Sequence, residues 1–189
     1  MDAFLISTGL VALAEMGDKT QLLALLLAAR YRQPLPILMA ILLATLFNHA
    51  LAAALGAWLA DFLNPEVLRW ILGISFIAMA GWMLIPDTLD DDENSISRWQ
   101  RFGVFGATFV LFFLAEIGDK TQIATVALAA RFDGLLMVLA GTTLGMMIAN
   151  APAVFIGDRL AGRLPITLIH RIAALVFLLI GIGVFFFSP

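Results

Sequence analysis

The chain has 189 residues, of which 62% are hydrophobic and 13% are charged, and its formal net charge is −3. With a mean hydropathy of +1.00, it is far more apolar than a soluble domain, whose apolar share is roughly 45–50%. This composition indicates an integral membrane protein and gives no support for nucleic-acid binding. There is no cysteine, and histidine occurs only at His49 and His170. Disulfides and thiolate or histidine-rich zinc sites are therefore excluded, and any metal site must use oxygen ligands.

Six apolar stretches approach the roughly 20 residues that a bilayer-spanning helix needs. In chain order they cover residues 3–29, 35–60, 67–86, 102–130, 135–157 and 166–187. We therefore predict an all-α integral membrane protein with six transmembrane helices. No basic region precedes the first stretch, and no arginine-rich or serine-rich extension is present. We accordingly expect no cleaved signal peptide and a location in a prokaryotic plasma membrane.

The first and fourth stretches carry the same polar motif. A shift of 101 residues places LAEMGDKTQ (13–21) on LAEIGDKTQ (114–122), with eight of nine positions identical. We infer two related three-helix repeats, residues 1–86 and 101–189, separated by an acidic linker at 87–100. Because three is odd, the second repeat enters the membrane from the opposite side, which predicts an inverted repeat.

The arginines predict the orientation of the chain in the membrane. Seven of them fall on one predicted side: Arg30, Arg32, Arg98, Arg101, Arg159, Arg163 and Arg171. Only Arg69 and Arg131 fall on the other side. Since basic residues concentrate in cytoplasmic loops, we expect the linker to be cytoplasmic and both termini to face outward.

The repeated motif places charges where they are costly. A charged residue at mid-helix costs about 2.5–3.5 kcal/mol on insertion scales, so these residues cannot all face lipid. In a continuous α-helix, Glu15, Asp18 and Lys19 would share one face, because they are spaced i, i+3 and i+4. Glycine in the motif would leave room for an ion or another backbone. The second motif repeats these charges as Glu116, Asp119 and Lys120, and the two glycines are Gly17 and Gly118. The neutral oxygen ligands of the two motifs are Thr20, Thr121, Gln21 and Gln122.

The two motifs together predict a site for a divalent cation. Four carboxylates and two ammonium groups sum to a charge of −2, and antiparallel motif helices would bring the carboxylates together near the midplane. Oxygen ligands favour Mn²⁺, Ca²⁺ or Mg²⁺. Clustered carboxylates in a low dielectric repel one another, so without a cation some should hold protons. Alternating access would then exchange cations for protons, with the lysines either tuning the carboxylates or replacing the ion. Ion pairs that only hold helices together are a weaker explanation, because buried pairs add little net stability.

Other polar residues and helix breakers lie within the apolar stretches. Asn48 and Asn150 occupy matching regions of the two repeats and are candidates for lining the cation path, although a hydrogen bond between helices is the simpler explanation. His49 is interpreted as a packing or hydrogen-bonded residue. Pro152 is expected to kink or break its helix. The GTTLG segment at 141–145 has the spacing that allows close helix packing.

Two copies of Glu-x-Gly-Asp-Lys-Thr on the first and fourth of six helices resemble the signature of the Gdt-type manganese/calcium cation/proton exchanger family. The resemblance covers essentially the whole chain. It implies a cation exchanger that binds Mn²⁺, and often Ca²⁺, through Glu15, Asp18, Glu116 and Asp119. The absence of a eukaryotic-type targeting extension points to the bacterial branch of manganese exporters.

We thus predict a secondary transporter whose partners are a divalent cation, protons and the bilayer. We expect no enzymatic activity, because little of the chain remains outside the membrane to form a substrate cleft, and no resident cofactor. A proton-coupled exporter of a small organic solute is the alternative. The oligomeric state stays open, a homo-oligomer included.

Overall fold

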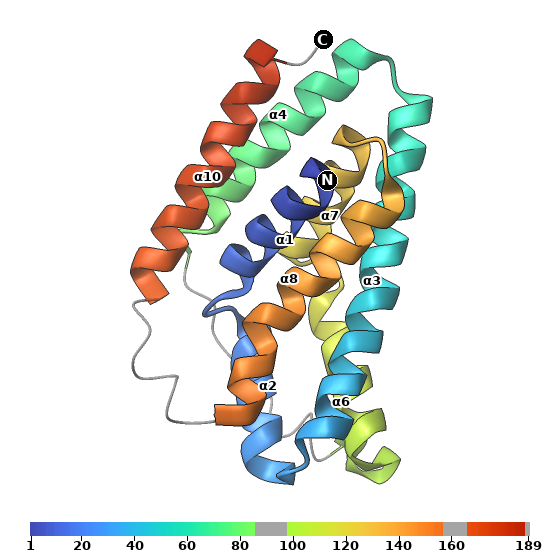
Figure 1. Ribbon diagram of the computed structural model, residues 1–189, viewed down its shortest axis with the longest axis vertical. Helices are drawn as coiled ribbons and strands as arrows, with labels where there is room; N and C mark the ends of the chain where they lie inside the picture. The colour runs from blue at the N-terminus through green and yellow to red at the C-terminus, as the bar shows by residue number, and fades with distance from the viewer. Residues whose placement is uncertain (86–97, 157–165, 188–189) are drawn as a thin grey trace.

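The computed structural model describes residues 1–85, 98–156 and 166–187, and these residues form helices and short connections without a β-strand (Figure 1). Most of the acidic linker predicted at 87–100 lies outside the described residues, since positions 86–97 are not described. The same is true of Arg159 and Arg163, which belong to the undescribed range 157–165.

The helices account for most of the predicted apolar stretches. They are α1 (Asp2–Glu15), α2 (Lys19–Tyr31), α3 (Pro34–Phe62), α4 (Pro65–Trp82), η1 (Gln100–Phe102), α6 (Gly103–Glu116), α7 (Lys120–Arg131), α8 (Leu135–Ile156) and α10 (Ile166–Phe187). Three of them, α3, α8 and α10, are long and apolar enough to cross a membrane, and α6 is a shorter apolar helix. The chain is therefore an all-helical integral membrane protein. The arrangement as six spans in an inverted repeat stays a prediction.

The first and fourth predicted helices are each broken at the motif. The stretch 3–29 is divided into α1 and α2, and 102–130 into α6 and α7. Continuous helices were the wrong prediction there, because a glycine with positive φ interrupts each helix, at Gly17 (φ 84°) and Gly118 (φ 75°). The four remaining stretches match α3, α4, α8 and α10 to within a few residues.

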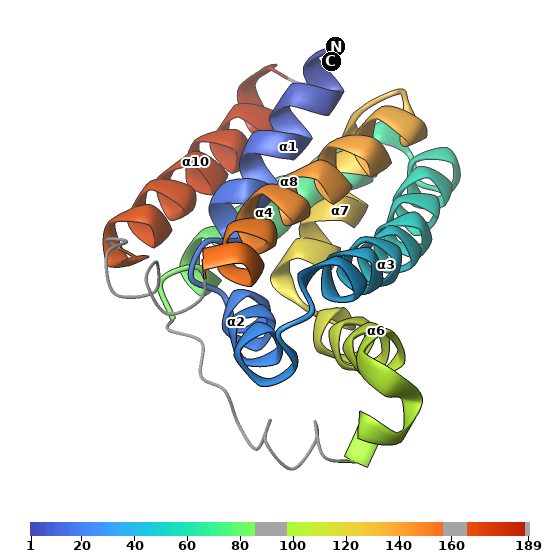
Figure 2. The same cartoon turned by 60° about the horizontal axis from the view of Figure 1, so that its bottom comes forward.

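The helices pack in pairs that connect the two repeats. In Figures 1 and 2, α10 runs beside α4, α1 lies on α8, and α3 lies beside α6 and α7. A β-carbon added at Gly141 would lie 2.6 Å from the carbonyl oxygen of Phe4, and one added at Gly145 would lie 2.6 Å from that of Thr8. The predicted close packing at the GTTLG segment is thus confirmed, since α1 and α8 approach each other through these glycines.

Pro152 does not end its helix, because α8 continues to Ile156. Of the expected kink or break, the break is therefore wrong, and the kink stays a prediction. Proline removes a single backbone donor, and neighbouring groups in a membrane bundle can compensate for that loss.

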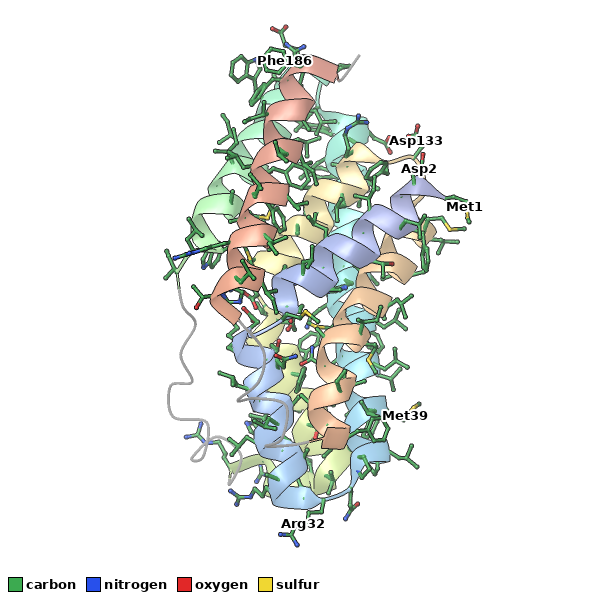
Figure 3. All side chains as sticks on the ribbon, turned by 60° about the vertical axis from the view of Figure 1, so that its left-hand side comes forward. Met1, Asp2, Arg32, Met39, Asp133 and Phe186 are labelled. Carbon is green, nitrogen blue, oxygen red and sulfur yellow. The ribbon has the colours of Figure 1, made fainter. Side chains whose placement is uncertain are left out.

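Acidic and basic residues mark the two ends of the molecule. Figure 3 shows Asp2 and Asp133 close together toward one end and Arg32 at the other. The two helix breaks lie well inside the molecule, away from both ends of its long axis (Figure 1). The motifs are therefore positioned between the two polar ends.

Candidate cation site

Each Glu-x-Gly-Asp segment forms a tight turn between two half-helices. In the first motif, Met16 has φ −65° and ψ 113°, Gly17 has φ 84°, and the Asp18 amide donates to the Glu15 carbonyl oxygen at 3.1 Å. These values are those of a type II β-turn, whose third position requires a positive φ and therefore favours glycine. The motif glycine thus serves the backbone conformation of the turn.

The turn of the second motif has nearly the same backbone angles. Ile117 has φ −64° and ψ 119°, and Gly118 has φ 75°. A β-carbon at Gly118 would have nothing within 4 Å. No other backbone approaches Gly118 in the described part of the chain, room for an ion there stays a prediction, and the positive φ gives a separate reason for the glycine.

Hydrogen bonds from the side chains that follow each turn stabilise it. Gln21 Oε1 accepts a hydrogen bond from the Gly17 amide (2.9 Å), and Thr20 Oγ1 donates to Glu15 Oε2 (2.7 Å). The second motif has the same bonds, from the Gly118 amide to Gln122 Oε1 (2.7 Å) and from Thr121 Oγ1 to Glu116 Oε2 (3.2 Å). The neutral oxygens of the motif therefore shape the turn and hold the glutamates in place.

Three of the four predicted carboxylates come together. Glu15, Asp18 and Asp119 each place one carboxylate oxygen within 4.8 Å of those of the other two, and all three side chains are buried. Glu116 is buried as well but does not belong to this group of three. Among the described residues, Glu15 Oε1 and Glu116 Oε1 have no hydrogen-bond partner. The cluster joins residues of both motifs.

The lysines pair across the two motifs. Lys120 Nζ lies 2.5 Å from Asp18 Oδ1, and Lys19 Nζ lies 3.5 Å from Asp119 Oδ2. The two pairs differ in exposure, because Lys19 is 33% exposed and Lys120 is 1% exposed. Each aspartate therefore has the lysine of the other repeat as its partner. The prediction that Glu15, Asp18 and Lys19 share one helix face is wrong, since the turn separates Glu15 from the helix that Lys19 begins.

The sequence comparisons place both halves of the chain in one family. The family described as "Divalent cation/proton antiporter GDT1" matches residues 3–91 and 104–188.

The chain belongs to this family.

Sequence alignments with relatives extend over nearly the whole chain. A Vibrio cholerae protein that is provisionally named a manganese exporter is 55% identical over 99% of this chain and 92% of its own length. The GDT1-like protein sll0615 of Synechocystis is 28% identical over 96% of both chains. The divalent cation/proton antiporter GDT1 of Saccharomyces cerevisiae is 24% identical over 96% of this chain and 82% of its own length. No solved structure is detectably similar.

Membership of the GDT1 family decides the class of function. The chain is a cation transporter and not an enzyme, and a divalent cation and protons are the transported species of the family. This result favours the cation exchanger over the exporter of an organic solute. The predicted resemblance to the Gdt-type family is confirmed.

The two asparagines proposed to line the path make different contacts. Asn48 Nδ2 donates to the Phe113 carbonyl oxygen (3.0 Å) and so links α3 to α6. Asn150 Nδ2 donates to the Met146 carbonyl oxygen (3.1 Å) within α8. A more direct link to the motif is Gln21 Nε2, which donates to the Ala149 carbonyl oxygen (2.6 Å). The side chain of Gln21 therefore connects the first turn to the neighbouring helix α8 through hydrogen bonds.

Two histidines behave differently from each other. His170 Nε2 donates to the Met16 carbonyl oxygen (2.8 Å), which ties α10 to the first turn. Sequence analysis missed this contact, because the two residues are 154 positions apart and nothing local links them. His49 is buried, and neither ring nitrogen has a hydrogen-bond partner in the described part of the chain. Of the two interpretations, packing or hydrogen bonding, these contacts favour packing for His49.

Proposed function

We propose that the chain exports Mn²⁺ in exchange for protons and that Glu15, Asp18 and Asp119 bind the cation. The observation that carries this proposal is the buried group of three carboxylates, whose oxygens lie within 4.8 Å of one another. Carboxylates so close repel one another in a low dielectric, and either a cation or protons relieve that repulsion. The site therefore favours two alternative occupants, which is what an exchanger requires.

The charge of the two motifs matches a divalent cation. Four carboxylates and two ammonium groups sum to −2, and all four carboxylate side chains are buried. We assign Glu116 as the fourth acidic group, because it is buried and occupies the position in the second motif that Glu15 has in the first. A monovalent cation would leave half of this charge uncompensated.

The half-helices reinforce the preference for a cation. Helix α1 ends at Glu15 and α6 ends at Glu116. The carbonyl groups at a helix C-terminus carry partial negative charge, and broken helices in transporters use these ends to coordinate cations near the bilayer centre. Carbonyl oxygens of the two turns can therefore supplement the carboxylates.

The identity of the cation follows from the ligand chemistry and from a relative. Oxygen ligands suit Mn²⁺, Ca²⁺ and Mg²⁺, and the chain has no cysteine to select a softer metal. The similar Vibrio cholerae protein is provisionally named a manganese exporter. We therefore propose Mn²⁺ as the main substrate and Ca²⁺ as a second one.

The lysines provide the charge that replaces the cation. Lys120 contacts Asp18, and Lys19 contacts Asp119, so both aspartates are paired with ammonium groups in this conformation. When the divalent cation enters, it takes over the aspartates and the ammonium groups withdraw. Because each pair joins the two repeats, a movement of one repeat against the other would make or break both pairs. This coupling is the alternating-access step that we propose.

The exposure of the cluster suggests an access route. Lys19 is 33% exposed, whereas Asp18, Lys120 and Asp119 are at most 2% exposed. We assign the route to the side of Lys19. The end of the molecule that carries Arg32 (Figure 3) is assigned to the cytoplasm, since basic residues favour that side. Export then moves Mn²⁺ from this end to the end that carries Asp2.

Exchange in liposomes tests the proposed function. The full chain is reconstituted in vesicles loaded with Mn²⁺ and a pH-sensitive dye, and the external Mn²⁺ is removed. We expect the lumen to acidify as Mn²⁺ leaves and protons enter, with a smaller response to Ca²⁺ and none in protein-free vesicles. A pH change that does not depend on the divalent cation would contradict the proposal.

A further inference from the structure

An apolar cavity on the side of the bundle lies apart from the carboxylate cluster. It has a volume of about 480 Å³ and is lined by residues of α1, α4, α7 and α10 and by Phe132 at the end of α7. Its volume is within the range of ligand pockets, roughly 300–1,000 Å³. The cavity has no part in the proposed cation exchange, so its role needs a separate explanation.

The cavity reaches from the membrane-facing surface to the core. Leu5 and Ile6 are 59% and 40% exposed, whereas Leu10 and Phe76 are buried, and all four line the cavity. On α1 the lining runs from Leu5 to Leu13, and the eight steps between these residues correspond to about 12 Å along a helix. The shape is that of a slot running from the surface into the hydrocarbon depth of the bundle.

Two glycines keep the slot open. Gly9 of α1 and Gly183 of α10 both line the cavity, and a β-carbon added at either would have nothing within 4 Å. In contrast, the α8 glycines Gly141 and Gly145 are required by close packing. Gly9 and Gly183 therefore leave space that no part of the described chain fills.

Of the described residues that line the slot, Arg131 is the one that carries a charge. It is the last residue of α7, two positions before Asp133, which Figure 3 places beside Asp2 at the end of the molecule. The Arg131 guanidinium lies 5.8 Å from the centre of the Phe132 ring. Within residues 1–85, 98–156 and 166–187, it forms no ion pair with an acidic side chain. A cation without an acidic partner among the described residues thus lies at the edge of an apolar slot.

We propose that this slot binds a phospholipid, with one acyl chain between α1 and α10 and the phosphate held by Arg131. Apolar cavities stay dry, so water does not fill the slot, and acyl chains are the abundant apolar molecules in a bilayer. The planar guanidinium binds phosphate oxygens with two parallel hydrogen bonds. The apolar slot matches an acyl chain of the lipid, and Arg131 at its edge matches the phosphate.

Native mass spectrometry of the full chain tests this proposal with phosphatidylglycerol as the probe and diacylglycerol as the headgroup-free comparison. We expect the delipidated protein to bind one phosphatidylglycerol in preference to diacylglycerol. Arg131→Gln should lower the affinity for phosphatidylglycerol by about tenfold or more, since a hydrogen bond to a charged group contributes roughly 1.5–3 kcal/mol. Gly9→Phe and Gly183→Phe, which fill the slot from two different helices, should abolish the preference.

Matched controls are available in α4. Gly81→Phe adds the same side chain at a position with nothing within 4 Å and outside the cavity lining, and Arg69→Gln removes an arginine that does not line it. Both should bind phosphatidylglycerol like the unmodified chain. Thermal unfolding identifies any variant that is misfolded. If one of the two filling variants fails to fold, the other, on a different helix, still tests the proposal.

Three results would overturn the proposal. The first is equal binding of phosphatidylglycerol and diacylglycerol. The second is unchanged binding in a folded Gly9→Phe or Gly183→Phe variant. The third is disulfide crosslinking between two copies of a Gly9→Cys variant, since the natural chain has no cysteine. That crosslink would assign the slot to a contact between copies of the chain.

Discussion

Replacing either motif aspartate by asparagine is expected to lower Mn²⁺/proton exchange by about 100-fold or more, because even residues that only support a metal ligand account for 10–100-fold in affinity. Asparagine keeps the shape of the side chain and one oxygen but removes its charge. Asp18→Asn and Asp119→Asn each change the motif charge from −2 to −1 and leave a lysine without its partner. The measurement is the rate of Mn²⁺-dependent acidification of the vesicle lumen.

Asp61→Asn is the matched control for this prediction. Asp61 is exposed near the end of α3 and is not in the carboxylate group. The control should exchange Mn²⁺ at the rate of the unmodified chain. If Asp18→Asn and Asp119→Asn both retain that rate, the assignment of the cation site is wrong.

Removal of the buried lysine is expected to have the largest effect on stability. Lys120 is 1% exposed and contacts Asp18, which is fully buried. Breaking a buried ion pair by removing one partner costs about 3–5 kcal/mol, because the remaining charge is left uncompensated. Lys120→Gln should therefore lower the free energy of unfolding by about that amount in the absence of divalent cations. Thermal unfolding in detergent measures the effect.

Lys19→Gln provides the comparison for Lys120→Gln. Lys19 is 33% exposed and lies 3.5 Å from its partner, and partly exposed pairs contribute about 1 kcal/mol or less. Saturating Mn²⁺ should restore the stability of Lys120→Gln more than it stabilises the unmodified chain, because the cation replaces the missing ammonium charge and binds the folded state. Equal unfolding temperatures for the two variants, or no rescue by Mn²⁺, would contradict the role proposed for Lys120.

Much of the helical arrangement could be predicted from composition and hydropathy. The positions of α3, α4, α8 and α10 follow from apolar stretches of membrane-spanning length. The repeated octapeptide predicted two equivalent halves of one site, and the turns at Met16 and Ile117 have nearly the same φ and ψ. The two nearly identical local sequences adopt the same local structure because the turn depends on residues within the motif.

The helix breaks could not be read from hydropathy, because the motif lies within an apolar stretch that continues on both sides. The local signals were present: glycine at the third position of a type II turn, and aspartate as the N-cap of the helix that follows. In the second motif, Asp119 Oδ1 accepts a hydrogen bond from the Lys120 amide at 2.7 Å. These signals compete with the spacing of Glu15, Asp18 and Lys19, which also fits a continuous helix.

The partners of the lysines depend on tertiary structure. Lys19 is next to Asp18 in the chain, yet it pairs with Asp119 of the other motif. The contact between His170 and Met16 and the slot beside Arg131 likewise arise from helix packing. No spacing within one segment encodes these contacts, so the sequence pointed to the clustered carboxylates but not to their lysine partners.

The position of bound Mn²⁺ tests the central claim most directly. Crystals of the full chain grown with Mn²⁺ can be measured at the manganese absorption edge, where anomalous scattering locates the ion. We predict a peak among the carboxylates of Glu15, Asp18 and Asp119, with the ammonium groups of Lys19 and Lys120 displaced from the aspartates. A peak at another place in the chain, with both ion pairs intact, would contradict the account.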